Sequence, residues 1–150
     1  MILQRRPFLK SIAAIFMVGL LKPSGLLAAT WNKTAFSAKT VMDAMMDSGY
    51  GGAADSTDIA LHVPDIAEDG SIVPVEVTSN IPGTVSMAIF AEKNPNPMVA
   101  EFFFSDGTEP YIAIHIKMAK TSTVRVAVKA GGKVYTTGKE VKVTIGGCGG

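Results

Sequence analysis

The sequence predicts an all-β protein, an immunoglobulin-like antiparallel β-sandwich with a short N-terminal helix and a flexible C-terminal arm, Gly-Gly-Cys-Gly-Gly. Seven short segments of alternating apolar and polar residues follow one another from residue 58, with turn residues between them, which is typical of a sandwich. No long segment of helical periodicity separates them, so a parallel α/β sheet is disfavoured. The 150 residues are 47% hydrophobic and 18% charged, which supplies a core for one domain and excludes a disordered chain.

Residues 1–29 are predicted to form a signal peptide of the twin-arginine type. Arg5 and Arg6 are followed by Pro-Phe-Leu-Lys, by an apolar run and then by small residues. This pattern resembles the twin-arginine export signal, with Arg5 and Arg6 as the recognised pair and Gln4 where Ser or Thr is usual. We expect export of the folded protein to the bacterial periplasm by the Tat machinery, with cleavage near Ala29; an ordinary secretory signal is the alternative.

The net charge is divided unevenly along the chain. Four of the 14 basic residues precede residue 30, in a segment without Asp or Glu, so 10 basic residues remain against 13 acidic ones. The rest of the chain therefore carries a net charge of about −3, and the basic surface that nucleic acids require is not expected. The apolar run in the signal is too short and interrupted to span a membrane, and the mature form, without the signal, is not expected to enter one.

Residues 30–57 are expected to form an N-terminal helix and a linker. The helix is predicted over 39–48 and should end at Gly49, because glycine is the usual residue just after a helix. Four apolar residues at i, i+4 spacing are expected to form one core-facing side, although such a stripe could also bind copper or haem: Val41, Met42, Met45 and Met46. Residues 50–54 are predicted to be a flexible connection.

The β-sandwich is expected over 58–145. Its strands are predicted over 59–63, 72–78, 85–90, 99–104, 111–118, 121–129 and 133–145. Pro74 suggests that its strand lies at a sheet edge, and Glu68-Asp69-Gly70 suggests a turn. The alternate apolar residues of four strands are expected to face the core: Val73, Val75, Val77, Ile112, Ile114, Ile116, Met118, Val124, Val126, Val128, Val141, Val143 and Ile145, with Arg125 and Lys129 facing outward.

No pattern in the sequence predicts a catalytic or metal site. His62 and His115 lie within strand patterns and are expected at the surface, because a zinc site requires four ligands at characteristic spacing. Nucleophile elbows, phosphate loops and dinucleotide fingerprints are missing from the sequence. We therefore expect a protein without metal, cofactor or catalytic activity of its own.

The single cysteine, Cys148, stands in the tail that is predicted to be the working part of the protein. Strand pairing should end at Gly146, because glycines bury no side chain and are costly to order. Residues 146–150 should then project by roughly 16 Å when extended. An exported domain usually pairs its cysteines, and this thiol has no base beside it in the sequence. It therefore suits a carried substrate that a partner enzyme activates better than a catalyst.

Three alternative roles for the cysteine compete with that of a carrier. Prenylation requires three residues after the cysteine, and only two follow Cys148. An accident of a frayed terminus does not account for glycines on both sides, at Gly146, Gly147, Gly149 and Gly150. An intermolecular disulfide that joins two copies stays open as a side reaction or resting state.

The sequence resembles the SoxY family, the sulfur-carrying subunits of the bacterial thiosulfate-oxidising complex. The resemblance rests on the last ten residues, Val-Lys-Val-Thr-Ile-Gly-Gly-Cys-Gly-Gly. It is supported by residues 63–70, by Val-Pro-Val at 73–75, by Glu-Lys-Asn-Pro-Asn-Pro at 92–97, and by the twin-arginine start. It implies that Cys148 is the covalent attachment site on a swinging arm, and that the four glycines give the arm flexibility and clearance at the entrances of partner enzymes.

The resemblance also implies the partners. SoxZ would be the second subunit of a heterodimer, the haem enzyme SoxAX would couple thiosulfate to the cysteine, and SoxB would release sulfate by hydrolysis. SoxCD, where present, would oxidise the remaining sulfane sulfur. Two other functions stay open: a diglycine sulfur carrier that forms a thiocarboxylate at Gly150, and an immunoglobulin-like binding or assembly module with a dimerising thiol.

Overall fold

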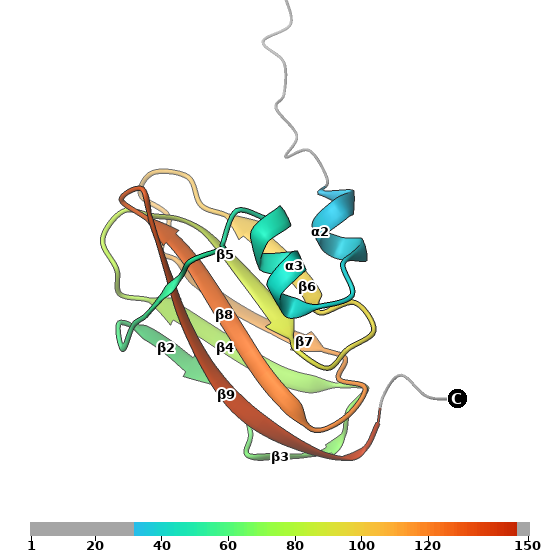
Figure 1. Cartoon of the computed structure of the whole chain (residues 1–150). Coiled ribbons are helices and arrows are strands. Elements are labelled where there is room, and N and C mark those ends of the chain that lie inside the picture. Colours follow the sequence, from blue (N-terminus) through green and yellow to red (C-terminus); the bar gives the residue numbers. More distant parts are fainter. Residues whose placement is uncertain (1–31, 147–150) are drawn as a thin grey trace, which may run out of the picture. The chain divides into compact units, whose positions relative to one another are not determined.

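The computed structural model describes residues 32–146, which form a β-sandwich with two short helices (Figure 1). The predicted signal peptide over 1–29, with Arg5 and Arg6, lies outside the described residues. Within 32–146 no helix has the length and apolar character that crossing a bilayer requires. The all-β, immunoglobulin-like prediction is confirmed, since strands in two sheets make up most of the described chain.

The larger sheet has the strand order β1-β9-β8-β5-β6, and β3 also pairs with β9. Its strands are β1 (Ala54–Asp55), β3 (Ile66–Asp69), β5 (Thr84–Ala91), β6 (Met98–Phe103), β8 (Ser122–Ala130) and β9 (Lys133–Ile145). Neighbours from β9 to β6 are antiparallel, whereas β1 and β3 run parallel to β9. The smaller sheet is antiparallel, with the order β2 (Ile59–His62), β4 (Val73–Ser79) and β7 (Tyr111–Ile116).

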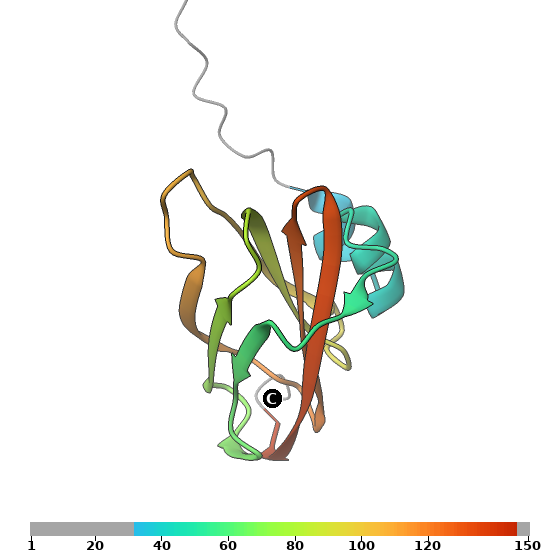
Figure 2. The same cartoon turned by 90° about the vertical axis from the view of Figure 1, so that its left-hand side faces the viewer.

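The core lies between the two sheets, which form separate layers in Figure 2. The alternation of β4 and β8 places Val73, Val75 and Val77 opposite Val124, Val126 and Val128, and all six are fully buried, as predicted. Met118 and Val141 are buried as well, and Ile112 and Ile116 are nearly so. Ile145, which is predicted to face the core, is 69% exposed, because β9 continues past the end of the smaller sheet's apolar face.

Two details of the strand predictions are wrong. The strand that contains Pro74 is not at an edge, because β4 is the central strand of the smaller sheet. Proline is tolerated there because β4 pairs with β2 only from Glu76 to Ser79, so Pro74 has no β2 partner on that side. The turn predicted at Glu68-Asp69-Gly70 begins later, because Glu68 and Asp69 end β3, which sequence alternation does not indicate, and Gly70 lies in the turn that follows.

Two helices cover the outer face of the larger sheet, α2 (Lys33–Ser37) and α3 (Val41–Asp47). α3 confirms the predicted helix: the Thr40 hydroxyl caps its start by accepting from the Asp43 amide at 3.1 Å, and Gly49 follows its end with φ of 73°. α2 has no counterpart in the sequence-based prediction, because five residues carry too little periodicity to detect.

The predicted apolar side of α3 is only partly correct. Val41 and Met45 pack toward the sheet, whereas Met42 and Met46 are 66% and 61% exposed. The buried side is centred on Ala44, which is fully buried. The two i, i+4 pairs are offset by about 100° around the helix, so both could not face one sheet.

The connection after α3 is anchored, contrary to the flexible segment predicted over 50–54. Tyr50 is fully buried, and its hydroxyl donates to the Ser86 hydroxyl at 2.8 Å. The Lys129 ammonium lies 4.0 Å from the centre of the Tyr50 ring and donates to the Ser48 carbonyl at 2.7 Å. Tyr50 therefore fixes the helices to the larger sheet.

Candidate functional site

The predicted attachment residue Cys148 lies outside the described residues, together with Gly147, Gly149 and Gly150. Gly146 is the member of the predicted arm that the structure describes, and it is exposed at the end of β9. The geometry of the site is therefore that of the arm root, which we define as Ile145 and Gly146 with the two segments beside them, 69–70 and 117–121.

Near its C-terminal end, β9 changes the strand with which it pairs. The antiparallel pairing of β9 with β8 ends at Val141, which lies opposite Ser122. Pairing with β3 then continues in parallel from Lys142 to Ile145. The Gly70 amide extends this contact by donating to the Ile145 carbonyl at 2.7 Å, so β9 is held by backbone hydrogen bonds up to the residue before Gly146.

A threonine takes the place of β8 along the other edge of β9. The Val143 amide donates to the Thr121 hydroxyl at 2.9 Å, and the Thr121 hydroxyl in turn donates to the Val143 carbonyl at 3.4 Å. One side chain thus satisfies both backbone groups of Val143 where the ladder has ended. The end of β9 is therefore fixed from both sides.

Gly146 is required by close packing as well as by any need for flexibility. A Cβ atom added to Gly146 would collide with the carbonyl oxygen of Ala119 and would lie 3.3 Å from the carbonyl carbon. Gly146 does not have a positive φ, so this requirement is steric and not conformational. The sequence-based prediction assigns Gly146 to clearance at partner enzymes, and the structure adds this contact within the chain.

The segment that contacts Gly146 is itself held on two sides. The Ala119 amide donates to Asn94 Oδ1 at 2.8 Å, and Asn94 Nδ2 donates to the Lys117 carbonyl at 2.7 Å. Between them, the Met118 amide donates to the Gly70 carbonyl at 2.7 Å, and the Met118 side chain is fully buried. Residues 117–119 therefore connect the loop that contains Asn94 with the end of β3.

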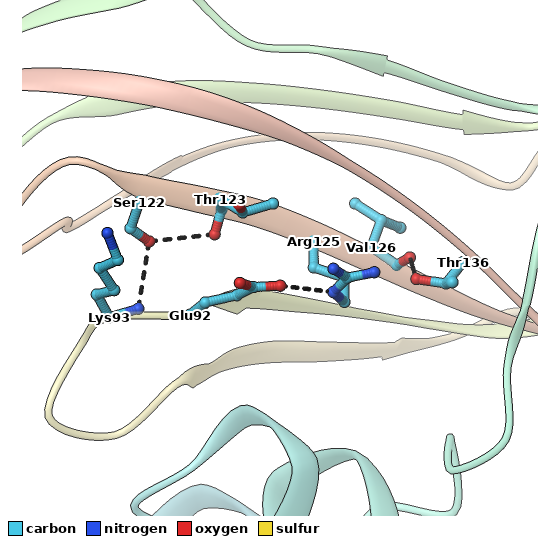
Figure 3. Close-up of polar contacts among 7 residues, drawn as sticks. All are labelled: Glu92, Lys93, Ser122, Thr123, Arg125, Val126 and Thr136. Atoms are coloured by element: carbon cyan, nitrogen blue, oxygen red, sulfur yellow. Dashed lines mark hydrogen bonds and ion pairs between the residues drawn. The ribbon is translucent and has the colours of Figure 1, made fainter.

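The loop over 92–97 is anchored on β8 (Figure 3). The Glu92 carboxylate accepts from Arg125 Nε at 2.7 Å, and the Lys93 amide donates to the Ser122 hydroxyl at 3.2 Å. Arg125 and Lys129 point away from the core, as predicted, but both are half-buried and paired.

Two carboxylates at the two ends of β3 are stabilised in the charged form. The side-chain hydrogen bond from Lys139, whose ammonium lies 2.9 Å from Asp65 Oδ1, holds the pKa of Asp65 below its usual value. The Ser71 amide donates to Asp69 Oδ1 at 2.7 Å and lowers the pKa of Asp69 in the same way. Both groups are fully exposed, so they contribute charge to this end of the molecule more than they contribute stability.

Two further features of the described residues concern the predicted lack of a catalytic or metal site: the histidines and a surface hollow. Among residues 32–146, no three His, Cys, Asp or Glu side chains gather as metal ligands, and His62 and His115 are both exposed on the smaller sheet. A hollow of about 410 Å³ on β8 and β9 is lined mainly by hydroxyl groups and Arg125. Its guanidinium is already paired with Glu92, and the hollow also contains Asp55, so it has no excess of positive charge.

Sequence reasoning misses the segments that hold the arm root. Residues 92–97 are indicated only as a chain break, although asparagine in a proline-flanked loop often bonds to backbone groups. That composition is the available signal for Asn94. Thr121, Gly70 and Ala119 carry none, because their contacts depend on how the chain folds over long distances in sequence.

Comparison with known proteins identifies the family. The family model described as "Sulfur oxidation protein SoxY" matches residues 47–148, from the end of α3 through β9 and on to the cysteine. The chain belongs to the SoxY family. The solved structure of the sulfur carrier protein SoxY from Chlorobium limicola f thiosulfatophilum is 41% identical, with a TM-score of 0.61, and the match covers 69% of this chain and 96% of that chain.

More distant structures share only the fold with this SoxY family member. Superoxide reductase (neelaredoxin) from Ignicoccus hospitalis is 18% identical with a TM-score of 0.51, over 57% of this chain and 79% of that chain. A variant of the same reductase is 16% identical with the same TM-score, over 65% and 86% of the two chains. No curated protein sequence matches the chain.

Proposed function

We propose that the protein is a periplasmic sulfur carrier of thiosulfate oxidation, which holds thiosulfate-derived intermediates covalently on Cys148 and presents them to partner enzymes. The proposal is carried by the extent of the family match, which runs past Gly146 and ends on the chain's one cysteine. Cys148 follows Ile145, the last residue of β9, by three residues, which at full extension would carry the thiol roughly 10 Å from the end of the strand. A partner protein would then reach it without unfolding of the sandwich.

The chemistry requires a thiol and a partner that accepts electrons. In the loading step, the Cys148 thiol and thiosulfate form a new S–S bond, the thiol proton is released, and two electrons pass to the partner oxidase. In the unloading step, water attacks the terminal sulfonate sulfur and the bond between the two sulfur atoms of thiosulfate breaks. Sulfate and two protons leave, and a persulfide remains on the cysteine. The carrier itself supplies neither the electron acceptor nor the base.

The arm root suits such a carrier, because it combines a fixed origin with a small residue at the exit. β9 is held by β3, Gly70 and Thr121 up to Ile145, and Gly146 follows directly. Glycines on both sides of Cys148 leave its backbone without side chains that would block a narrow entrance. We therefore assign Gly146, Gly147, Gly149 and Gly150 to access and mobility of the arm.

The partners and the compartment belong to the same proposal. The Tat machinery would export the folded protein through recognition of Arg5 and Arg6. In the periplasm it would pair with SoxZ and would meet SoxAX for loading, SoxB for hydrolysis and, where present, SoxCD for oxidation of the sulfane sulfur. The carrier needs no cofactor of its own, because the only group that it would carry is the sulfur bound covalently to Cys148.

Mass spectrometry of the reduced, mature protein tests the proposal. The protein is incubated with thiosulfate, the partner haem oxidase and an electron acceptor, and its mass is measured before and after reduction. We expect an adduct of one thiosulfate on Cys148, which reduction removes and which Cys148→Ser abolishes. A modification at Gly150 would instead support the thiocarboxylate carrier, and an unmodified protein would support the binding or assembly module. Either result overturns the proposal.

A further inference from the structure

The segment Glu-Lys-Asn-Pro-Asn-Pro over 92–97 has no part in the proposed sulfur chemistry, yet one of its side chains reaches the arm root. The Asn94 amide group donates to the Lys117 carbonyl at 2.7 Å and accepts from the Ala119 amide at 2.8 Å. These two bonds join alternate residues of the segment 117–119, as the backbone of a neighbouring strand would. Asn94 therefore orders a segment that, within residues 32–146, pairs with no strand on that side.

The opposite edge of the same segment is bound to the end of β3. The Met118 amide donates to the Gly70 carbonyl, and the Gly70 amide donates to the Ile145 carbonyl, each at 2.7 Å. Residues 117–119 are thus held from one edge by Asn94 and from the other by Gly70. The peptide planes on either side of Met118 have little freedom to rotate while both sets of bonds persist.

Ala119 links this ordered segment to Gly146, where the arm begins. The carbonyl oxygen of Ala119 occupies the space that a Cβ on Gly146 would fill, while the amide of the same residue is bound to Asn94. If Asn94 is lost, the Ala119 amide has no other described partner, and its carbonyl is free to move away from Gly146. The conformation of Gly146 would then be less restricted at the point where the arm begins.

The loop that carries Asn94 is stiff enough for this role. The Asn94 backbone amide donates to the Ala91 carbonyl at 3.0 Å, and the Glu92 amide donates to the Thr123 carbonyl at 3.1 Å. The Glu92 carboxylate is paired with Arg125 (Figure 3), and Pro95 restricts the backbone directly after Asn94. The loop is tied to β5 and β8, so it provides a fixed point in the larger sheet.

We propose that Asn94 is a positioning residue for sulfur carriage, which fixes the start of the arm by holding the Ala119 carbonyl against Gly146. This inference rests on the proposed function. A carrier whose arm begins in one orientation presents more of its population in the form that a partner accepts. Removal of the Asn94 amide group lowers that fraction and weakens the apparent affinity in proportion, without changing the thiol or the chemical step.

Steady-state loading of Cys148 by the partner haem oxidase tests the inference. The carrier is the varied substrate, with thiosulfate and the electron acceptor in excess. Asn94→Ala is expected to raise KM for the carrier by about threefold or more at unchanged kcat, as the competent fraction falls. Asn96→Ala is the matched control in the same loop, because the Asn96 amide donates only a long bond of 3.4 Å to the Ala38 carbonyl, far from the arm root. It should leave both constants unchanged.

Two further measurements separate positioning from damage. The rate at which a small aromatic disulfide reagent modifies Cys148 should be equal in all variants, because such a reagent needs no docking. Gly146→Ala disturbs the same contact from the other side, at an exposed residue that the sandwich core does not need, and it should raise KM as Asn94→Ala does. This variant decides the question should Asn94→Ala fail to fold.

Failure of the inference and failure of the proposed function give different results. If the wild-type protein is not loaded at all, the proposed function is wrong. If the wild type is loaded and Asn94→Ala and Gly146→Ala keep its KM, the positioning role is wrong while the carrier function stands. An equal rise of KM in Asn94→Ala and Asn96→Ala would also overturn the positioning role, since it would report a general effect of the loop.

Discussion

Two glycine junctions, Gly49 and Gly146, lie where the chain reaches the larger sheet and where it leaves it, and they serve different purposes. At the first, Gly49 takes a positive φ of 73° between α3 and Tyr50, which is fully buried. At the second, Gly146 follows Ile145, which is 69% exposed, and Gly146 is small because the Ala119 carbonyl leaves no room for a Cβ. Glycine therefore provides a backbone conformation beside a buried anchor at Gly49, and space for a neighbouring carbonyl at an exposed exit at Gly146.

Removal of the Tyr50 side chain should have the largest effect on stability. Tyr50→Ala empties a fully buried site and removes the hydrogen bond to Ser86 and the ring beneath the Lys129 ammonium. We expect a loss of about 3–5 kcal/mol in the free energy of unfolding, measured by urea denaturation. Tyr111→Ala, at a tyrosine that is 49% exposed, should change it by less than about 0.5 kcal/mol. Similar losses in the two variants would contradict the role of Tyr50 as an anchor.

Substitution of Gly49 should come next, and Gly52 provides a matched control. Both glycines have a positive φ, 73° and 70°, so alanine at either should cost about 1–2 kcal/mol. A Cβ at Gly49 would also lie 3.2 Å from the Lys129 ammonium, whereas nothing lies within 4 Å of a Cβ at Gly52. Gly49→Ala should therefore be the more destabilising of the two in thermal unfolding. Equal losses would mean that Lys129 moves aside without cost and that only the backbone matters.

The first junction should also respond to high pH. Burial raises the pKa of Tyr50, the Ser86 hydrogen bond partly opposes this, and the charge of Glu101 adds to the rise. Because the folded pKa lies above the unfolded one, the stability from neutral Tyr50 is complete below pH of about 10 and is lost as pH increases beyond it. Unfolding followed between pH 8 and 12 should show this loss in the wild type and a smaller one in Tyr50→Phe. The same slope in both would assign the alkaline loss to other groups.

Substitutions beyond the second junction should have the smallest effect on stability. Gly149→Val adds a branched side chain next to Cys148, four residues after the last residue of β9 in the sequence, so the free energy of unfolding should change by less than about 0.5 kcal/mol. Loading by the partner oxidase should nevertheless slow, because a β-branched residue is bulkier and stiffer at an enzyme entrance. Gly147→Val tests the other side of the cysteine. Normal loading of both variants would show that the glycines are not needed for access.

The parts of this fold that can be predicted from sequence are those in which one residue's neighbours decide its environment. The alternation of β4 and β8 determines which side of each strand is buried, and Thr40 and Gly49 mark the ends of α3. β3 escapes prediction because Glu68 and Asp69 show no apolar alternation: this strand is held to β9 mainly through its backbone.

The sequence predicts the cysteine of the candidate site, but it does not predict the segments that hold the arm root. A lone cysteine among glycines is conspicuous in any sequence, and the family match includes it. The bonds of Asn94 to Lys117 and Ala119 cross 23 and 25 residues of chain, and they exist only because the 92–97 loop folds back over the end of β7. A polar side chain that binds distant backbone leaves no periodic trace in the sequence.

The 13 residues of β9 also determine how the protein bears a mechanical load. Under the proposed function, a partner enzyme would pull on the chain beyond Gly146. The backbone hydrogen bonds that join β9 to β8, β1 and β3 lie across the strand, so a pull along the axis of β9 would load these ladders in shear. In shear the force would be shared among many bonds of the strand, which would protect the sandwich during repeated handling of the arm.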